Sequence, residues 1–203
     1  MTRSLVDLSR PDNSAYDKGR SALWRILWHF AGLPLLRANW LPVSAIKVRL
    51  LRLFGARVGR GIYWKPGVRV KFPWHLTVGD HCWIGEDAWI DNLAQVTIGS
   101  NVCLSQGAYL CTGNHDWTTP NMKLFTRPIT LRDGCWVGAR SVVCPGVTIG
   151  EGAVLAAGGV TAKDIPAFEI WAGNPARFVK TRELKPRKTS EPTTAPIRLV
   201  TPA

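Results

Sequence analysis

The sequence predicts an all-β protein, a parallel β-helix with an N-terminal helical cap and a projecting loop. The first observation behind this prediction is a repeat: from Val58 onward an apolar residue stands at every sixth position, commonly followed four positions later by a small residue or Cys. A period of six differs from the ~3.6 of an α-helix and the ~2 of a β-strand. It is typical of a solenoid in which six residues form one short strand and one turn. The second observation is a single long polar interruption of this repeat.

The repeat keeps one phase over a long series of apolar positions. These are Val58, Trp64, Val70, Val78, Ile84, Ile90, Ile98, Leu104, Leu110, Leu131, Val137, Val143, Ile149 and Leu155. Two early steps contain eight residues instead of six, 70 to 78 and 90 to 98, and both fall at the same corner of successive coils. An antiparallel β-sandwich with frequent glycine turns is the alternative, but it gives no reason for a constant phase. The coil interpretation is therefore favoured.

Residues 1–57 are predicted to form a helical, basic and tryptophan-rich segment. Its longest stretch without Lys or Arg, Ile26 to Leu36, is shorter than the ~20 apolar residues that span a bilayer, and it lacks the features of a cleaved signal peptide. One interpretation is a cap over the open end of the solenoid. The other is attachment to the anionic inner face of a membrane through Trp24, Trp28 and Trp40. Both can hold in a cytoplasmic protein.

Residues 58–176 are predicted to form the solenoid, with a loop at 113–130. From Leu110 to Leu131 the chain advances 21 residues; one repeat accounts for six of them, so 15 must leave the coil. Polar excursions from a rigid scaffold commonly carry binding or catalytic groups. The aromatic residues next to the inward corners should point outward and pack against another subunit, with Trp136, directly after the loop, as the expected exception. They are Tyr63, Trp83, Trp89, Tyr109 and Trp136.

His115 at the start of this loop is the candidate general base. A neutral imidazole can remove a proton from a hydroxyl group near neutral pH, and Asp116 or a backbone carbonyl could hold the ring in the required tautomer. The alternative is that the Asn114-His115-Asp116 run only forms a turn, since Asn and Asp are common turn residues. The residues alone leave these two interpretations open.

Charge and cysteine content limit the classes of function. The net charge of +12 is concentrated at the ends of the chain: residues 1–57 carry ten Lys/Arg and three Asp/Glu, residues 58–176 nine of each, and residues 177–203 seven and two. This distribution, without a nucleic-acid-binding motif, argues against nucleic acid as a partner. The odd set of five cysteines contains no CxxC pair, which favours reduced, packed thiols over disulfides or a metal site. The basic, Pro/Thr-rich segment 177–203 is predicted to be a disordered tail.

Three segments resemble the hexapeptide-repeat acetyltransferases related to galactoside and nodulation-factor O-acetyltransferases. They are "VTIGSNVCLSQGAYLCTGNHD", "CWVGARSVVCPGVTIGEGAVLAAGGVTAKDIP" and "WAGNPAR". Within that group, "LLRLFGARVG" and "FPWHLTVGDHCWIGEDAWIDN" are most similar to the colanic acid biosynthesis acetyltransferases of bacterial exopolysaccharide clusters. The resemblance covers about residues 45–180 and implies a left-handed coil, a homotrimer and acetyl-CoA as co-substrate.

The resemblance also implies roles for individual residues. His115 would deprotonate a sugar hydroxyl, and the backbone amide near Ala139 would stabilise the oxyanion. Further positions match those that line the CoA arm: Trp136, Ala139, Ala157, Lys163 and Arg177. The acceptor pocket is expected to include Asp91, Asn92, Asn114, Asp116 and Trp117. The family's coil Asn before the histidine has no secure counterpart in this chain, so the acceptor is not specified.

The function expected from these residues is transfer of an acetyl group to an exopolysaccharide or its lipid-linked precursor. Direct transfer is favoured over a covalent acyl-enzyme, because no cysteine lies within two residues of His115, although Cys111 could approach it in space. A zinc carbonic anhydrase on the same solenoid needs three converging histidines, which the four present do not suggest. A non-catalytic scaffold of a polysaccharide assembly complex is the remaining alternative.

Overall fold

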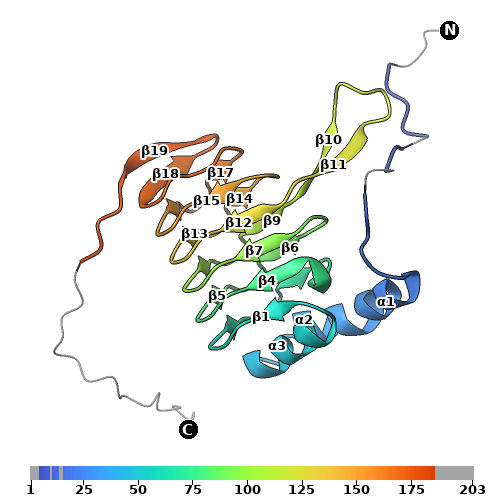
Figure 1. Cartoon of the computed structure of the whole chain (residues 1–203), viewed down its shortest axis with the longest axis horizontal. Coiled ribbons are helices and arrows are strands. Elements are labelled where there is room, and N and C mark those ends of the chain that lie inside the picture. The colour runs from blue at the N-terminus through green and yellow to red at the C-terminus, as the bar shows by residue number, and fades with distance from the viewer. Residues whose placement is uncertain (1–4, 10, 14–15, 186–203) are drawn as a thin grey trace.

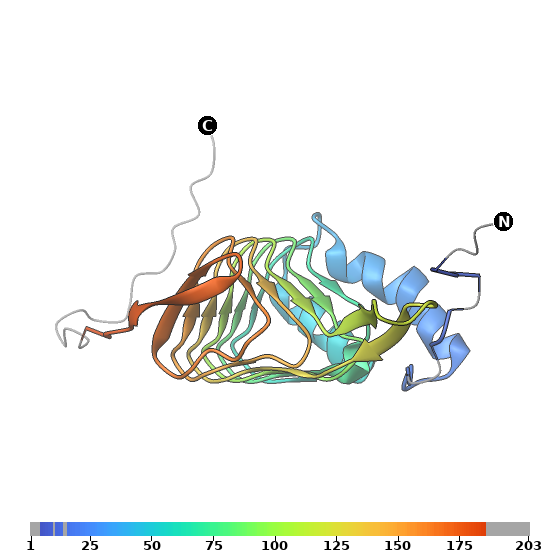
Figure 2. The ribbon, with the colours of Figure 1, turned by 90° about the horizontal axis from the view of Figure 1, so that it is seen from above.

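The computed structural model describes residues 5–9, 11–13 and 16–185 of the chain. Short parallel strands coil into a three-sided prism, a group of helices covers one end, and a hairpin projects from the side (Figure 1). The predicted parallel β-helix with a helical cap and a projecting loop is confirmed. Figure 2 shows the coils from above, with the hairpin and α1 (Ala22–Leu27) extending from the same side.

Three parallel sheets form the faces of the prism. The first face consists of β1 (Arg57–Val58), β4 (Leu76–Val78), β7 (Val96–Ile98), β12 (Ile129–Leu131) and β15 (Thr148–Ile149). The second consists of β2 (Tyr63–Trp64), β5 (Trp83–Ile84), β8 (Cys103–Leu104), β13 (Trp136–Val137), β16 (Val154–Leu155), β18 (Glu169–Gly173) and β19 (Ala176–Thr181). The third consists of β3 (Arg69–Val70), β6 (Trp89–Asp91), β9 (Tyr109–Cys111), β14 (Val142–Val143) and β17 (Val160–Thr161).

The strand register explains the repeat. On the second face Tyr63 pairs with Trp83 and Trp83 with Cys103, so these coils contain 20 residues, whereas Trp136 pairs with Val154, a coil of 18. The two additional residues lie where the eight-residue steps occur. Of the fourteen apolar positions, all except Val58 are buried, because Val58 belongs to the outermost coil. Stacked inward side chains therefore form one continuous core.

Two edges of the prism are important for the site. The hairpin edge is formed by the turns from the third face to the first, residues 71–75, 92–95, 112–128, 144–147 and 162–164. The alanine edge is formed by the turns from the second face to the third, residues 65–68, 85–88, 105–108, 138–141 and 156–159. A short 3-10 helix, η2 (Pro73–His75), occupies the first of the hairpin-edge turns.

The helical cap contains α1, a π-helical turn η1 (Trp28–Gly32), α2 (Leu33–Arg37) and α3 (Ser44–Leu53). Trp28 is buried, and its indole Nε1 donates a hydrogen bond to the Val70 carbonyl oxygen at 3.1 Å. A side chain at Gly32 would collide with the Trp28 ring, so this position must stay a glycine. None of the helices in the described part of the chain has the length and apolarity that a membrane span requires.

Two of the three tryptophans predicted to contact a membrane, Trp24 and Trp28, pack inside the cap instead. Trp24 packs on Phe54, with ring centroids 5.1 Å apart, and Trp28 packs on the same ring at 5.0 Å. Both tryptophans therefore stabilise the junction between the helices and the first coil. Trp40 remains exposed.

The loop 113–130 contains a two-stranded antiparallel hairpin, β10 (Gly113–Asp116) and β11 (Lys123–Thr126). An N-terminal segment braces it from outside. The Leu124 amide donates to the Asp12 carbonyl oxygen at 3.1 Å, and the Asp7 amide donates to the Pro120 carbonyl oxygen at 2.9 Å. Lys123 and Asp12 also form an ion pair at 3.4 Å.

The predicted disorder of the tail is wrong for its first residues. Residues 177–181 belong to β19, which pairs antiparallel with β18, and Arg182 donates two further hydrogen bonds to the carbonyl oxygens of Gly134 and Gly152. The open edge of the last coil provides backbone partners that stabilise this strand despite its polar sequence. Residues 186–203 of the predicted tail lie outside the described residues.

Candidate active site

His115 lies on β10, where the hairpin leaves the solenoid, and its side chain is exposed. Its backbone pairs with Leu124 on β11, so the position of the ring depends on the hairpin. The Asn114 side-chain oxygen accepts a hydrogen bond from the His115 amide at 2.8 Å. Asn114 thus shapes the backbone immediately before the candidate base.

The backbone carbonyl of Met122 defines the tautomer of His115. Its oxygen lies 2.7 Å from His115 Nδ1. A carbonyl oxygen can only accept a hydrogen bond, so the neutral ring carries its proton on Nδ1 and leaves the lone pair of Nε2 free. Met122 has a φ of 46°, a left-handed conformation that is uncommon for a non-glycine residue. Sequence reasoning anticipated a carbonyl partner but could not identify which one.

Asp116 does not contact the His115 ring through any hydrogen bond of the described residues. Its carboxylate instead accepts hydrogen bonds from the backbone amide of Thr118 at 2.9 Å and from the Thr118 hydroxyl at 2.6 Å, which lower the pKa of Asp116. Asp116 therefore stabilises the tip of the hairpin. Trp117, 77 % exposed, stands beside it with an open aromatic face.

A hollow of about 460 Å³ lies against His115. The predicted residues Asn114, Asp116 and Trp117 all line it. The structure adds Lys123, Phe125 and Arg127 to this group, and the Arg127 guanidinium lies 5.5 Å from the centre of the Phe125 ring. Lys123 and Phe125 are on the returning strand β11 and Arg127 directly follows it, and the sequence pattern alone gives no sign of their approach to His115.

Asp91 ends β6 on the third face, and Asn92 begins the adjoining turn of the hairpin edge, one coil before the hairpin. Asn92 is fully buried: its side-chain oxygen accepts from the Phe72 amide at 2.9 Å, and its nitrogen donates to the carbonyl oxygens of Phe72 and His75. A side chain with both polar atoms used in the core cannot contact an acceptor, so its assignment to the acceptor pocket is wrong. Asp91 pairs with Lys71 at 3.1 Å and accepts from the Tyr109 hydroxyl at 3.2 Å.

The alanine edge brings together three of the positions matched to the CoA arm. Trp136, 45 % exposed, is fixed by a hydrogen bond from its Nε1 to the Ser105 hydroxyl at 2.8 Å. Ala139 and Ala157 lie in the neighbouring turns of two successive coils. The Ala139 carbonyl oxygen accepts from the Gly158 amide at 2.8 Å, while the Ala139 amide has no acceptor among the described residues.

This edge has the shape that a narrow acyl arm requires. A side chain built at Gly158 would meet no atom within 4 Å, so the surface beside Ala157 is open. Small residues allow an extended ligand to reach the backbone, and the free Ala139 amide is a fixed hydrogen-bond donor. These observations fit the pantetheine arm of a CoA thioester.

Lys163 and Arg177 do not lie beside Trp136, Ala139 and Ala157 of the same chain. Lys163 lies on the hairpin edge, two coils beyond the hairpin, and Arg177 lies on β19. Both side chains are exposed. The Arg177 guanidinium donates to the Ala176 carbonyl oxygen at 2.9 Å, and the structure does not place either cation beside Ala139.

The two clusters lie on different edges of the prism. The third face separates them, and at ~3.3 Å per extended residue its width is on the order of 15 Å. The hairpin projects away from the coils, which increases this separation (Figures 1 and 2). Proton transfer and acyl transfer require contacts of about 3 Å. At this separation, His115 and Ala139 of one chain cannot both contact the same reacting group.

The thiols of the described residues offer no activated nucleophile at either edge. Burial raises the pKa of Cys103, Cys144 and Cys82, and raises that of Cys135 to about 12. The sequence allowed Cys111 to approach His115 in space. Its thiol instead donates a hydrogen bond to the Gly113 carbonyl oxygen at 3.0 Å. No three His, Cys, Asp or Glu side chains of the described part come together as metal ligands.

Two protein-family models match the coils of this chain, one on each side of the hairpin. The family "Bacterial transferase hexapeptide (six repeats)" matches residues 128–163, and "Hexapeptide repeat of succinyl-transferase" matches residues 75–111. WcaF of Escherichia coli strain K12, whose name describes a colanic acid biosynthesis acetyltransferase, is 39 % identical over 145 residues, covering 70 % of this chain and 80 % of the relative. The galactoside O-acetyltransferase of the same strain is 32 % identical over 134 residues, covering 64 % and 66 %.

Solved structures have the same fold. The hexapeptide-repeat acetyltransferase VCA0836 of Vibrio cholerae superimposes with a TM-score of 0.69 at 27 % identity, covering 80 % of this chain and 94 % of that one. The same protein in complex with acetyl-CoA gives a TM-score of 0.73 at 25 % identity, covering 81 % and 92 %.

Proposed function

The chain belongs to the hexapeptide-repeat O-acetyltransferases, and on this premise we propose that it transfers an acetyl group from acetyl-CoA to a sugar hydroxyl of a bacterial exopolysaccharide or its lipid-linked precursor. The acetyltransferase class and its acyl donor follow from the family. The relation to WcaF favours a colanic-acid-like polysaccharide. A lipid-linked acceptor would give the basic N-terminal segment a reason to contact the cytoplasmic face of a membrane.

The observation that carries the catalytic part of this proposal is the hydrogen bond between His115 Nδ1 and the Met122 carbonyl oxygen. It leaves Nε2 as the proton acceptor of the exposed ring. Nε2 removes the proton from the acceptor hydroxyl as that oxygen bonds to the acyl carbon. The Ala139 amide donates a hydrogen bond to the negative charge that develops on the acyl oxygen.

Acetyl-CoA supplies the acyl group in this reaction. When the carbon–sulfur bond breaks, the imidazolium of His115 returns its proton to the leaving sulfur, so the base is regenerated. The raised thiol pKa values and the bound Cys111 thiol support direct transfer without an acyl-enzyme. Trp117 would stack on the face of the sugar ring, beside Asn114.

Assembly of a homotrimer is part of the proposal. His115 and Ala139 are on different edges, and a neighbouring copy could bring its alanine edge against the hairpin edge of the first. The outward aromatic residues of the second face support a subunit contact there: Tyr63 and Trp83 are 58 % and 61 % exposed, and their rings pack 5.4 Å apart. Closed symmetry would then give identical composite sites.

The experiment that tests the function is acetyl-CoA turnover, measured as release of free thiol, with a panel of nucleotide-linked and lipid-linked bacterial sugars. We expect sugar-dependent release that falls at least about 100-fold in His115→Ala, the range for loss of a general base. His81→Asn is the matched control, since His81 is also exposed but lies on the edge between the first and second faces. Equal turnover in wild type and His115→Ala would refute the role of His115. A protein that does not bind CoA would instead support the scaffold alternative.

A further inference from the structure

The helices of the cap have two apolar faces, and only one of them is covered. Trp24, Trp28 and Leu36 face the first coil. A second series of apolar side chains points to solvent along 22–37, and we name it the outer stripe: Leu23, Ile26, Leu27, Phe30 and Leu35. Their spacing of three or four residues between Leu23 and Phe30 places them on one side of the helix. Leu23 and Phe30 are 76 % and 74 % exposed.

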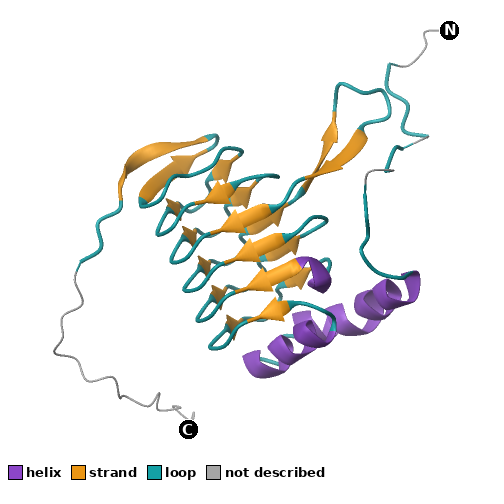
Figure 3. Cartoon of the chain, in the orientation of Figure 1, coloured by secondary structure: helices purple, strands orange, loops and turns teal. Residues whose placement is uncertain are grey.

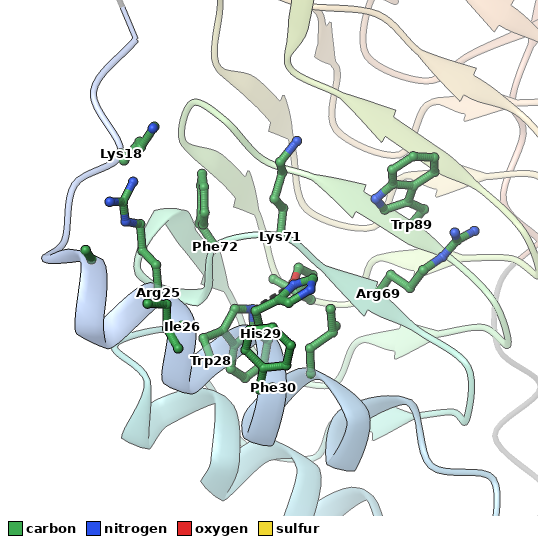
Figure 4. A pocket seen from close by; sticks show the side chains of 13 residues that line it. Lys18, Arg25, Ile26, Trp28, His29, Phe30, Arg69, Lys71, Phe72 and Trp89 are labelled. Carbon is green, nitrogen blue, oxygen red and sulfur yellow. Dashed lines mark hydrogen bonds between the residues drawn. The ribbon is translucent and has the colours of Figure 1, made fainter.

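A groove of about 560 Å³ lies between this helix and the third face (Figure 4). Its lining is largely apolar and aromatic, with Trp28, Phe72 and Trp89 along it. Figure 4 shows the charged ends of Lys18, Arg25 and Lys71 pointing toward the same open side of the groove. Arg69 stands at the opposite end, with its guanidinium 4.5 Å from the centre of the Trp89 ring.

The cations of this region have few anionic partners. The sequence contains no Asp or Glu from residue 18 to residue 79, a stretch with twelve Lys and Arg. Within the described residues, only Lys71 of the groove has a carboxylate partner, Asp91. The Nε atom of Arg25 is buried without a hydrogen-bond acceptor. An apolar groove with unpaired cations on its rim fits a ligand that is anionic at one end and apolar at the other.

We propose that the cap docks on a bilayer that contains acidic phospholipids. The outer stripe enters the interface, and the cations at the two ends of the groove, Arg25 and Arg69, each face lipid phosphates. Each cation near an acidic surface adds electrostatic attraction, and amphipathic helices with a basic border bind in this way. A second copy of the chain is a poorer occupant, because two caps in contact would bring their acid-free surfaces together. This inference does not depend on the acceptor proposed above.

The test is co-sedimentation of the full-length protein with vesicles of phosphatidylcholine, alone or mixed with phosphatidylglycerol. We expect binding to the acidic vesicles at low salt, weak binding to the neutral ones, and release at high salt. The double variant Arg25→Gln/Arg69→Gln should bind at least about 10-fold more weakly, since two cations are lost. Phe30→Ser should also reduce binding, through loss of apolar burial in the interface.

Matched controls are available at the other end of the molecule. Arg132→Gln removes an exposed cation from the edge between the first and second faces, and Phe178→Ser removes an aromatic ring that is 53 % exposed on β19. Both should bind acidic vesicles like the wild type. Wild-type protein that ignores acidic vesicles, or controls that lose binding as strongly as the cap variants, would overturn the proposal. A change in subunit number of Phe30→Ser by light scattering, without weaker vesicle binding, would identify the stripe as a subunit contact and would overturn it too.

Discussion

The hairpin edge and the alanine edge are built from the same repeat but have opposite characters. At the hairpin edge the first two turns contain two additional residues each, and the third turn carries the projecting hairpin with His115. At the alanine edge every turn keeps its minimal length, and small residues leave the backbone accessible around Ala139 and Ala157. One edge therefore presents side chains, and the other presents main-chain groups.

This difference teaches how a rigid solenoid can support chemistry without deforming its core. Insertions at one corner do not disturb the stack, because the coils before and after the hairpin keep their register: Leu131 pairs with both Ile98 and Ile149. The polar side chains of the hairpin are thus added outside the core. The exposed backbone of the alanine edge, in contrast, is part of the coils themselves. Under the proposed mechanism, and given the width of the third face, the two surfaces meet between neighbouring chains.

The largest expected effect tests directly whether the hairpin edge of one chain acts with the alanine edge of another. His115→Ala and Ala157→Trp should each reduce acetyl transfer at least about 100-fold, the first by loss of the base and the second by obstruction of the open surface beside Gly158. Co-expression of the two variants should restore about a quarter of the wild-type activity per site. In a random closed assembly, that fraction of interfaces combines an intact His115 from one chain with an intact alanine edge from the next.

The measurement is thiol release by the purified mixed assembly, with differently tagged chains to prove mixing. Ala157→Ser is the control, because a small polar side chain leaves the surface open and should retain activity. Absence of restored activity in proven mixed assemblies would show that both groups act within one chain.

A smaller effect is expected from the backbone that holds the His115 tautomer. Met122→Val should lower kcat about 10-fold, because β-branched residues disfavour the left-handed conformation at φ 46° and the carbonyl would turn away from Nδ1. Met122→Gly, which accepts this conformation, should stay within about threefold of the wild type. If both variants lost activity equally, the Met122 side chain rather than its carbonyl would be important.

The solenoid could be predicted from the sequence because its period is local and repeated, so fourteen positions constrain one register. The projecting loop could be predicted for the same reason, as a break in that period, whereas its pairing into a hairpin could not. Contacts between distant segments carried no such signal: nothing in the sequence near Asp12 indicates that its carbonyl accepts from Leu124. The burial of Asn92 and Trp28 likewise depends on packing between coils and helices. Strand β19 was missed because its pairing partner, β18, determines its conformation more than its own composition does.

The smallest catalytic effect is expected from Asn92→Ala on the hairpin edge. The buried amide makes three hydrogen bonds to the backbone of Phe72 and His75, so its removal should lower the free energy of unfolding by about 1 to 3 kcal/mol. The KM for the acceptor should not change, because the side chain is fully buried. Thermal unfolding and steady-state kinetics of the same preparation measure the two quantities. A raised KM in a variant of wild-type stability would restore Asn92 to the acceptor pocket.

The N-terminal segment that braces the hairpin has a practical consequence for producing the enzyme. Asp7 contacts the hairpin turn at Pro120, and Asp12 contacts Lys123 and Leu124 of β11, so a bulky fusion partner joined directly before Asp7 would disturb the hairpin that positions His115. Removal of the first dozen residues, a common step in trimming an expression clone, would delete the same brace. A tag at the C-terminal end leaves the sequence of this brace unchanged and is the safer choice for kinetic work.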